Sequence, residues 1–356
     1  MDVELLDEKR ESDYAEVFSS SSNHLVYHSL KYRSFLKSVL SDCEDKYLIA
    51  YEDGRPVGAL PAFVKRNAEF GPVVNSLPFF GSNGGVMVHS KVSNPVEVKT
   101  GLLDAFRDLT DQEDAAASTI ISNPLQPDDE IYEALTHYTF TDDRIGQLVE
   151  LRNFNSRGNQ DLSEQLMAYF HRKTRNHIRK AVKSNVEVGV KNDPEAFSLL
   201  EDLHVNSMEG IGGRAKTSAF FEAIQNNLRP NHDFMLYVAW FENRIIAALL
   251  VLFSNKTSEY FMPATDVNYR SLQPMSLLIK TAMEEAVRRE MYYWNWGGTW
   301  LTQDGVYDFK SRWGTEDYPY HYYIRVRKPE ILENSKETLL NAYPNFYVCP
   351  FQQLKR

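Results

Sequence analysis

The segment LYVAWFENRIIAAL at residues 236–249 repeats YLIAYEDGRPVGAL at residues 47–60 without a gap. Each copy has a run of β-favouring residues, a polar turn and a second apolar run, which is the pattern of a β-hairpin. Ala50 aligns with Ala239, and Arg55 aligns with Arg244. A long-period repeat indicates a duplicated structural unit. The sequence therefore predicts two related α/β domains, with coincidence between two hairpins as the alternative.

The bulk composition fits a globular protein of two domains. The chain has 356 residues, of which 43% are hydrophobic and 25% charged. Its longest apolar run, residues 245–253, is far shorter than the ~20 residues of a membrane span. The opening residues MDVELLDE lack the pattern of a secretory signal, so none is expected. Cys43 and Cys349 form no metal-ligand or redox pattern, so we expect no metal and a cytoplasmic location.

The charge distribution is uneven. A formal net charge of −10 argues against DNA binding, whereas residues 171–183 hold six Lys or Arg and no acid. The 3.6-residue period predicts one amphipathic helix over 162–183, with Arg175, Arg179 and Lys183 on its polar face. Such a face is suited to phosphates, either of tRNA or of a nucleotide-linked acceptor. A merely solvated face is the alternative, and peripheral membrane contact stays open.

The domain boundary is predicted from a polar segment without periodicity, residues 153–161. We expect an N-terminal domain over 1–152 and a C-terminal domain over 161–328 that begins with the basic helix. Residues 329–356 form a tail with three aromatic residues, Tyr343, Phe346 and Tyr347. This tail is too aromatic to be free, so we expect it to pack back on the first domain.

Three motifs in the second half carry a family resemblance. They are RKTRNHIRKA at 172–181, DVNYR at 266–270 leading through Pro274 into a helix, and NWGG at 295–298 followed by DFKSRWG at 308–314. In their order and spacing they resemble the Fem family, the tandem-GNAT enzymes that build peptidoglycan interpeptide bridges, and its FemAB-like relatives. The resemblance is strongest from about residue 161 onward. It implies mixed α/β sheets in two tandem GNAT-like acyltransferase domains.

The resemblance also implies N-acyl transfer, in which an amine attacks an activated carbonyl and an amide results. In Fem enzymes the donor is aminoacyl-tRNA and the acceptor a peptidoglycan precursor, while FemAB-like relatives also act in surface-glycan pathways. We therefore expect a small-molecule or nucleotide-linked acceptor, tRNA as a partner and no tightly bound cofactor. Two alternatives stay open: an acyl-CoA-dependent N-acetyltransferase acting on an amino sugar or amino acid, and a non-catalytic module that binds RNA or a phosphorylated partner.

One loop bears on the donor. GNAT enzymes that use acyl-CoA hold its pyrophosphate in a glycine-rich turn at a helix start. Here the segment 270–275 keeps Arg270 but lacks both glycines, and Pro274 removes a donor amide. This argues against CoA, although Arg270 is still expected to bind substrate. In the first half, GSNGG at 81–85 offers glycines, so Gly84 lies either in a substrate-side loop or in a plain turn.

Candidate catalytic residues follow from the needs of amide formation, which are oxyanion stabilisation and protonation of the leaving group. Lys310, which the resemblance places next to the transfer site, is predicted to stabilise the oxyanion or hold a phosphate. Asp266 is predicted to orient the amine or accept its proton, and Tyr260 to protonate the leaving oxygen. The alternatives are a surface lysine in a turn, a capping aspartate and a core tyrosine. Trp313 is expected to pack against the substrate, and Arg214 to line the cleft.

Overall fold

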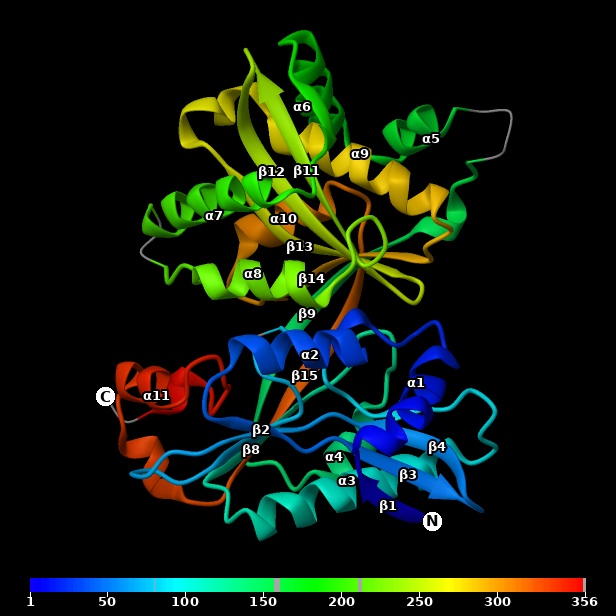
Figure 1. Cartoon of the computed structure of the whole chain (residues 1–356), viewed down its shortest axis with the longest axis vertical. Coiled ribbons are helices and arrows are strands. Elements are labelled where there is room, and N and C mark those ends of the chain that lie inside the picture. Colours follow the sequence, from blue (N-terminus) through cyan, green and yellow to red (C-terminus); the bar gives the residue numbers. More distant parts are fainter. Residues whose placement is uncertain (80, 157–160, 211–212, 355–356) are drawn as a thin grey trace. The chain divides into compact units, whose positions relative to one another are not determined.

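The computed structural model describes residues 1–79, 81–156, 161–210 and 213–354. Contacts within the chain define two compact units: unit 1 comprises Met1–Ile145 and Pro319–Arg356, and unit 2 comprises Gly146–Tyr318 (Figure 1). Strands β9 (Phe140–Glu150) and β15 (Glu316–Val326) contribute residues to both units. The expected boundary segment 153–161 lies partly outside the described residues, since these omit 157–160. Among the helices described, none is both long and apolar enough to cross a bilayer.

Unit 1 combines two sets of paired strands with helices. The strand order is β1-β3-β4-β7 in one sheet and β15-β8-β6-β5-β2 in another. Helix α3 packs on β3 and β4. The elements are β1 (Asp2–Leu5), α1 (Glu11–Ser19), α2 (Leu30–Val39), β2 (Cys43–Asp45), β3 (Leu48–Glu52), β4 (Arg55–Leu60), β5 (Phe63–Lys65), β6 (Val73–Asn75), β7 (Met87–Val88), α3 (Pro95–Gln112), β8 (Ala117–Ile121), α4 (Asp129–Leu135) and α11 (Lys336–Ala342).

Unit 2 is built around strands in the order β10-β11-β12-β13-β14. The first three pairs are antiparallel, and β13 pairs with β14 in parallel. Helix α7 packs on β12 and β13, and α9 packs on β11 and β12. The elements are α5 (Leu162–Tyr169), α6 (Arg172–Lys183), β10 (Glu187–Val190), α7 (Pro194–Glu209), α8 (Ser218–Asn227), β11 (Phe234–Phe241), β12 (Arg244–Ser254), β13 (Thr257–Thr265), α9 (Pro274–Arg288), β14 (Tyr293–Trp300) and α10 (Asp304–Ser311).

Both predicted hairpins are present, and they share two details of backbone geometry. Each turn has two consecutive residues with positive φ, Asp53 and Gly54 in the first hairpin and Glu242 and Asn243 in the second. This is the type I′ turn, whose twist matches that of the flanking strands. Each hairpin also has a β-bulge at the same aligned place, between residues 50 and 51 and between residues 239 and 240. Coincidence does not account for a shared turn type and a shared bulge.

The two units share strand order as well as hairpins. The order β1-β3-β4-β7 in unit 1 corresponds to β10-β11-β12-β13 in unit 2, with every pair antiparallel. The helix that follows, α3 or α9, begins in each case with a proline in its first turn, where no backbone donor is needed. The prediction of two related domains is confirmed. The hairpins also belong to different sheets, as two separate copies require.

Strand β12 explains the longest apolar run of the sequence. Its odd-numbered residues from 247 to 253 share a core cluster with α9, which includes Ala282 and Met283. On the other face, Phe197 of α7 contacts the ring of Phe234, whose neighbour on β12 is Leu252. A central strand with helices on both faces is apolar at every position rather than at alternate positions. The run is therefore a core strand.

The predicted single helix over 162–183 is wrong, because the chain breaks into α5 and α6. Phe170 and His171 have extended backbone angles, and the His171 side chain caps α6 by accepting from the Lys173 N–H. Arg175 donates to the carbonyls of Phe170 at 2.7 Å and Ala168 at 3.4 Å, at the end of α5. At this break, contacts with other side chains and segments replace the hydrogen bonds of a continuous helix. The periodicity of the sequence gives no information about such contacts.

The aromatic tail contacts other parts of unit 1. The backbone of Tyr347 is held by Asn75, whose amide donates to its carbonyl at 2.8 Å and accepts from its N–H at 2.7 Å. The Tyr343 hydroxyl donates to the carbonyl of Gly71 at 2.7 Å. The Tyr347 hydroxyl also donates to Asp142, which forms a buried ion pair with Arg144. These polar contacts therefore join the tail to segments of unit 1 that are distant from it in the sequence.

Candidate functional site

The gap between β13 and β14 is the first feature of the candidate site. The two strands pair only from Thr257 to Glu259 and from Tyr293 to Asn295, although both continue beyond this point. A β-bulge at Phe261 adds a further irregularity to β13. Parallel strands that separate in this way leave backbone groups free along one edge.

A cavity of about 470 Å³ lies beside β13 where it separates from β14. Its wall combines Tyr260 from β13, Phe309 from α10 and the first turn of α9. No side chain caps the first turn of α9, since the amide of Gln273 donates to the carbonyl of Arg270 instead. The remaining lining residues are Ser207, Met208, Pro263, Ala264, Thr265, Arg270, Gln273, Pro274, Met275 and Ser276.

Tyr260 is suited to proton donation. Its ring packs on Trp296, with 4.7 Å between centroids, while no residue in the described ranges hydrogen-bonds to its hydroxyl. Burial raises the pKa of Tyr260 well above the usual value for tyrosine. The hydroxyl is therefore protonated at neutral pH, as that of an ordinary tyrosine is, and can act as a hydrogen-bond donor. The packing of its ring fits the core-tyrosine alternative, and its place in the cavity lining fits the prediction of a proton donor.

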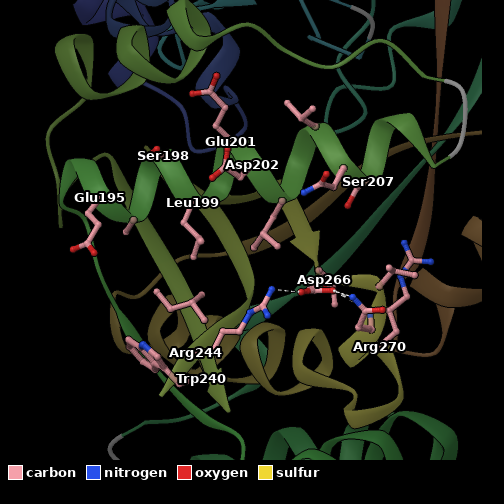
Figure 2. A pocket seen from close by; sticks show the side chains of 18 of the residues that line it. Glu195, Ser198, Leu199, Glu201, Asp202, Ser207, Trp240, Arg244, Asp266 and Arg270 are labelled. Atoms are coloured by element: carbon pink, nitrogen blue, oxygen red, sulfur yellow. Dashed lines mark hydrogen bonds and ion pairs between the residues drawn. The ribbon is translucent and has the colours of Figure 1, made fainter. Parts of the chain in front are cut away.

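A larger groove of about 1250 Å³ adjoins this cavity and shares Ser207, Thr265 and Arg270 with it. One wall is helix α7, and the other is formed by the β11–β12 turn and residues 265–270. Figure 2 shows Leu199 pointing from α7 toward the strands, and Arg244 pointing toward Asp266. Sequence analysis did not predict this groove, because it forms between segments that are distant in the chain.

Asp266 has a structural role within this groove. It accepts from the backbone N–H and the side-chain amide of Asn268, both at 3.0 Å, and so caps the turn of residues 267–272. It also forms an ion pair with Arg244 at 2.9 Å. These contacts match the capping alternative. The Arg270 guanidinium, by contrast, is exposed and has no side-chain partner in the part of the chain that the structure describes.

Lys310 is buried rather than on the surface, with 7% of the residue exposed. Its ammonium donates to the carbonyls of Gly297 at 3.2 Å and Gly298 at 3.1 Å, and to the Thr299 hydroxyl at 2.9 Å. Burial lowers the pKa of Lys310 to about 8. The Thr299 hydroxyl in turn donates to Gln147 at 3.0 Å. The lysine therefore holds β14 beside the gap, and the surface alternative is wrong.

Lys310 has no spare donor in this arrangement. An ammonium has three N–H groups, and three oxygens of β14 accept from them. Its neighbour Phe309, rather than Lys310 itself, lines the smaller cavity. Gly297, with φ of +71°, allows β14 to present its carbonyls to the lysine. The side chain thus controls the shape of the strand.

The structure corrects the expected role of Trp313. This residue is 1% exposed and lies in the core, where its ring contacts Phe170 at 4.9 Å and Trp296 at 5.5 Å between centroids. A ring this deeply buried has no surface left for a substrate. Trp313 instead supports Trp296, which packs against Tyr260.

Gly84 belongs to unit 1, whereas every residue that lines the two cavities belongs to unit 2. A Cβ at this position would lie 2.6 Å from the Ser76 hydroxyl oxygen and 2.9 Å from the backbone N of Leu77. The loop around it is tied to protein groups, with the Gly84 N–H donating to the Ile121 carbonyl at 2.9 Å. Close packing therefore explains this glycine. The strand of unit 1 equivalent to β13 is β7, only two residues long.

The basic face of α6 consists of exposed Arg172, Lys173, Arg179, Lys180 and Lys183. Within the described ranges none of these five has an ion-pair partner, whereas Arg175 is used in capping α5. Burial, and next the nearby cations Lys173, Arg312 and Lys180, lower the pKa of His177. Arg214 is exposed as well and lines neither cavity.

The basic face of α6 is connected to the smaller cavity through α10. The carbonyl of Arg312 accepts from the His171 N–H at 2.9 Å and from the Thr174 hydroxyl at 3.1 Å. Arg312 follows α10, whose Phe309 lines the cavity. No group of His, Cys, Asp or Glu side chains arranged to hold a metal occurs among the described residues.

Comparison with known proteins gives the class of this fold. Residues 170–311 match the family model of an acetyltransferase (GNAT) domain. The chain is similar to FemX, with 15% identity, a TM-score of 0.73, and coverage of 93% of this chain and 98% of FemX. It is also similar to a tandem GNAT protein from the clavulanic acid biosynthesis pathway, with 11% identity, a TM-score of 0.56, and coverage of 91% and 98%.

A third similar structure is the C-terminal domain of a putative lysylphosphatidylglycerol synthetase from Agrobacterium fabrum. Identity is 10%, the TM-score is 0.59, and coverage is 95% of this chain and 98% of that domain. No curated protein matches the chain in sequence.

These matches define the fold as that of the tandem GNAT acyltransferases, and they support acyltransferase activity. Within that class the chain is FemAB-like in architecture. The predicted fold class and the resemblance stated from the motifs are both confirmed. The matched domain extends from the end of α5 to α10 and so contains the gap, both cavities and the basic face of α6.

Proposed function

We propose that the chain is an N-acyltransferase that forms an amide between an aminoacyl donor carried on tRNA and an amine of a cell-envelope or surface-glycan precursor. The observation that carries the proposal is that Tyr260 lines the cavity beside the β13–β14 gap and that its hydroxyl has no hydrogen-bond partner among the described residues. A cytoplasmic location is part of this proposal, because aminoacyl-tRNA is made and used there.

The proposed step is attack of the acceptor amine on the ester carbonyl of the donor. The new C–N bond forms as the ester C–O bond breaks, and Tyr260 donates its proton to the departing ribose oxygen. The proton that the amine loses restores the phenol through solvent. In this proposal the carbonyl oxygen is bound by backbone N–H groups of β13 beyond its pairing with β14, and Lys310 fixes the backbone of β14 beside them.

The basic face of α6 supports tRNA as the donor carrier. Five exposed cations without ion-pair partners in the described chain form a positive surface on a protein with a net charge of −10. The start of α6 contacts Arg312, which follows α10, and Phe309 of α10 lines the smaller cavity. We infer that an RNA bound along this face directs its acylated end to that cavity. Arg179 and Lys183 keep their proposed role as phosphate contacts, whereas Arg175 is used for structure.

One observation favours acyl-CoA as a second candidate donor. The uncapped first turn of α9 opens on the cavity beside Arg270, and such a turn with a free guanidinium suits a pyrophosphate. The two donors are separated by assaying transfer from aminoacyl-tRNA and from acetyl-CoA to a set of primary amines. Tyr260→Phe is expected to lower the rate with the true donor at least about 100-fold, as loss of a general acid typically does.

The RNA surface is tested by replacing Lys173, Lys180 and Lys183 together with Glu. The matched control replaces exposed Lys9, Lys91 and Lys336 with Glu, so that both variants have the same net charge. Each lost phosphate contact reduces the slope of log affinity against log salt by roughly 0.7 to 0.9. A smaller salt slope in the α6 variant alone supports the proposal, and equal tRNA binding by both variants refutes it.

A further inference from the structure

The larger groove contains charges of both signs, most of which neutralise each other. On the basic side, Lys191 pairs with Glu195 at 3.0 Å, and Arg244 pairs with Asp266 at 2.9 Å. On the acidic side, Glu201 accepts from the Ser218 hydroxyl at 2.5 Å. Among the described residues that line the groove, one acid and one base have no side-chain partner, Asp202 and Arg270.

These two residues come from opposite walls of the groove. Asp202 lies on α7, and Arg270 lies in the turn that follows β13 (Figure 2). Apolar side chains, among them Leu199, Leu203 and Ile245, lie in the same walls. A groove of about 1250 Å³ exceeds the size of most small-metabolite pockets. The groove therefore has room for an extended molecule.

We propose that this groove binds the acceptor, and that the acceptor is amphoteric: it presents a cationic amine to Asp202 and an anionic carboxylate or phosphate to Arg270. This inference rests on the proposed function, which supplies the acceptor as the second substrate. A ligand that satisfies both side chains is favoured over one with a single charge, because each charge-assisted hydrogen bond adds to affinity and orientation.

The position of Arg270 links this groove to the transfer site. Arg270 lines both the groove and the cavity that Tyr260 also lines. An anionic group held by Arg270 therefore fixes the acceptor next to the β13–β14 gap. The ammonium at Asp202 lies further along α7 and binds a non-reacting part of the acceptor. Asp202 is thus a specificity residue, with no part in proton transfer.

The test measures binding alone, by calorimetry, and so does not depend on turnover or on the donor. The probes are L-alanine peptides of two to five residues, each in free, N-acetylated and C-terminally amidated form. O-phosphoethanolamine and its N-acetylated form serve as probes in which a phosphate replaces the carboxylate. The protein is the full chain and its variants Asp202→Asn and Arg270→Gln. Glu209→Gln, which removes a charge from α7 outside the groove, is the matched control.

The free form of at least one probe is expected to bind about 10-fold or more tightly than its blocked forms, the factor of one charge-assisted hydrogen bond. In Asp202→Asn, the free and the N-acetylated probe should bind with equal affinity, while the amidated probe should still bind more weakly than the free one. Arg270→Gln should have the opposite effect, and Glu209→Gln neither. Equal binding of free and blocked probes, or no binding of any free probe at millimolar concentration, overturns the inference.

Failure of the inference and failure of the proposed function have different signatures. If the charge pattern holds but neither donor supports transfer, the groove is an amphoteric binding site and the proposed reaction is wrong. If transfer occurs but binding is indifferent to both charges, the reaction stands and the acceptor assignment is wrong.

Discussion

Replacing Lys310 with Met tests the finding that this lysine is a buried clamp of β14. The change removes an ammonium that is 7% exposed and leaves the oxygens of Gly297, Gly298 and Thr299 without their donor. Methionine has a similar length and no charge, so the packing volume is largely kept. The expected effect is therefore electrostatic, and it depends on pH.

The magnitude follows from two opposing contributions. Three hydrogen bonds stabilise the folded state by about 1 kcal/mol each. Burial lowers the pKa of Lys310 from 10.5 to about 8, which corresponds to a cost of about 3 kcal/mol for the charged form. At pH 7 these contributions nearly cancel, so Lys310→Met should change the free energy of unfolding by less than about 2 kcal/mol.

The sign of the pH dependence follows from the direction of the shift. Between pH 8 and pH 10.5 the unfolded state keeps the proton on Lys310 while the folded state has lost it. The wild-type chain therefore gains stability over the Met variant as pH rises, by about 1.4 kcal/mol per pH unit. This part of the stability is fully present above pH 10.5 and is lost as the pH falls through 8.

The assay is urea unfolding, followed by tryptophan fluorescence, at several pH values from 7 to 10.5. The control is Lys180→Met, which removes an exposed lysine from α6. A wild-type minus Lys310→Met difference that stays constant across this range would refute a buried ammonium at position 310.

Three further predictions concern unit 1. Gly84→Ala should destabilise the protein by about 1 to 3 kcal/mol, because the new Cβ would lie 2.6 Å from the Ser76 hydroxyl oxygen. The control Gly305→Ala should not destabilise the protein, because its new Cβ would have no atom within 4 Å. Equal thermal midpoints of the two variants would contradict this prediction. Asn75→Ala should cost about 2 to 4 kcal/mol and make the tail sensitive to limited proteolysis, since both polar groups of the Tyr347 backbone lose a buried partner; a tail as resistant as in the wild type would argue against it. Burial lowers the pKa of His28 to about 3, so the wild type should lose about 2 kcal/mol of stability between pH 6.5 and pH 5 through this residue, and His28→Gln should lose correspondingly less; parallel pH profiles in urea unfolding would exclude this.

The sequence was sufficient to predict those elements whose conformation depends mainly on neighbouring residues. The two hairpins were predictable because their turn residues adopt positive φ readily and their strands are rich in β-favouring residues. The order of hairpin, strand, loop and helix was enough to indicate two GNAT-like domains. The basic character of α6 was equally evident, because six cations lie within 13 residues of sequence.

The chemistry of the candidate site was predictable only in part. Tyr260 and Arg270 line the smaller cavity, as residues on β13 and the following turn of a GNAT fold should. For Asp266 the sequence left two alternatives, a role in proton transfer and a capping aspartate. Its contacts in the structure are those of a capping aspartate. Asp202 and Gln147 were not singled out, because nothing in their local sequence distinguishes them from ordinary surface or core residues. Phe309 was part of the quoted motif at 308–314 but was given no role.

The sequence by itself determined which segments form hairpins, strands and helices, and where positive charge accumulates, because turn geometry, periodicity and charge are properties of neighbouring residues. Only the tertiary structure decided that Lys310 is buried on β14, that the helix over 162–183 breaks at Phe170, and that α7 and the turn after β13 enclose a groove. Each of these depends on contacts between segments far apart in the chain. Burial and hydrogen-bond partners are set by those contacts, and through them the pKa values of the site.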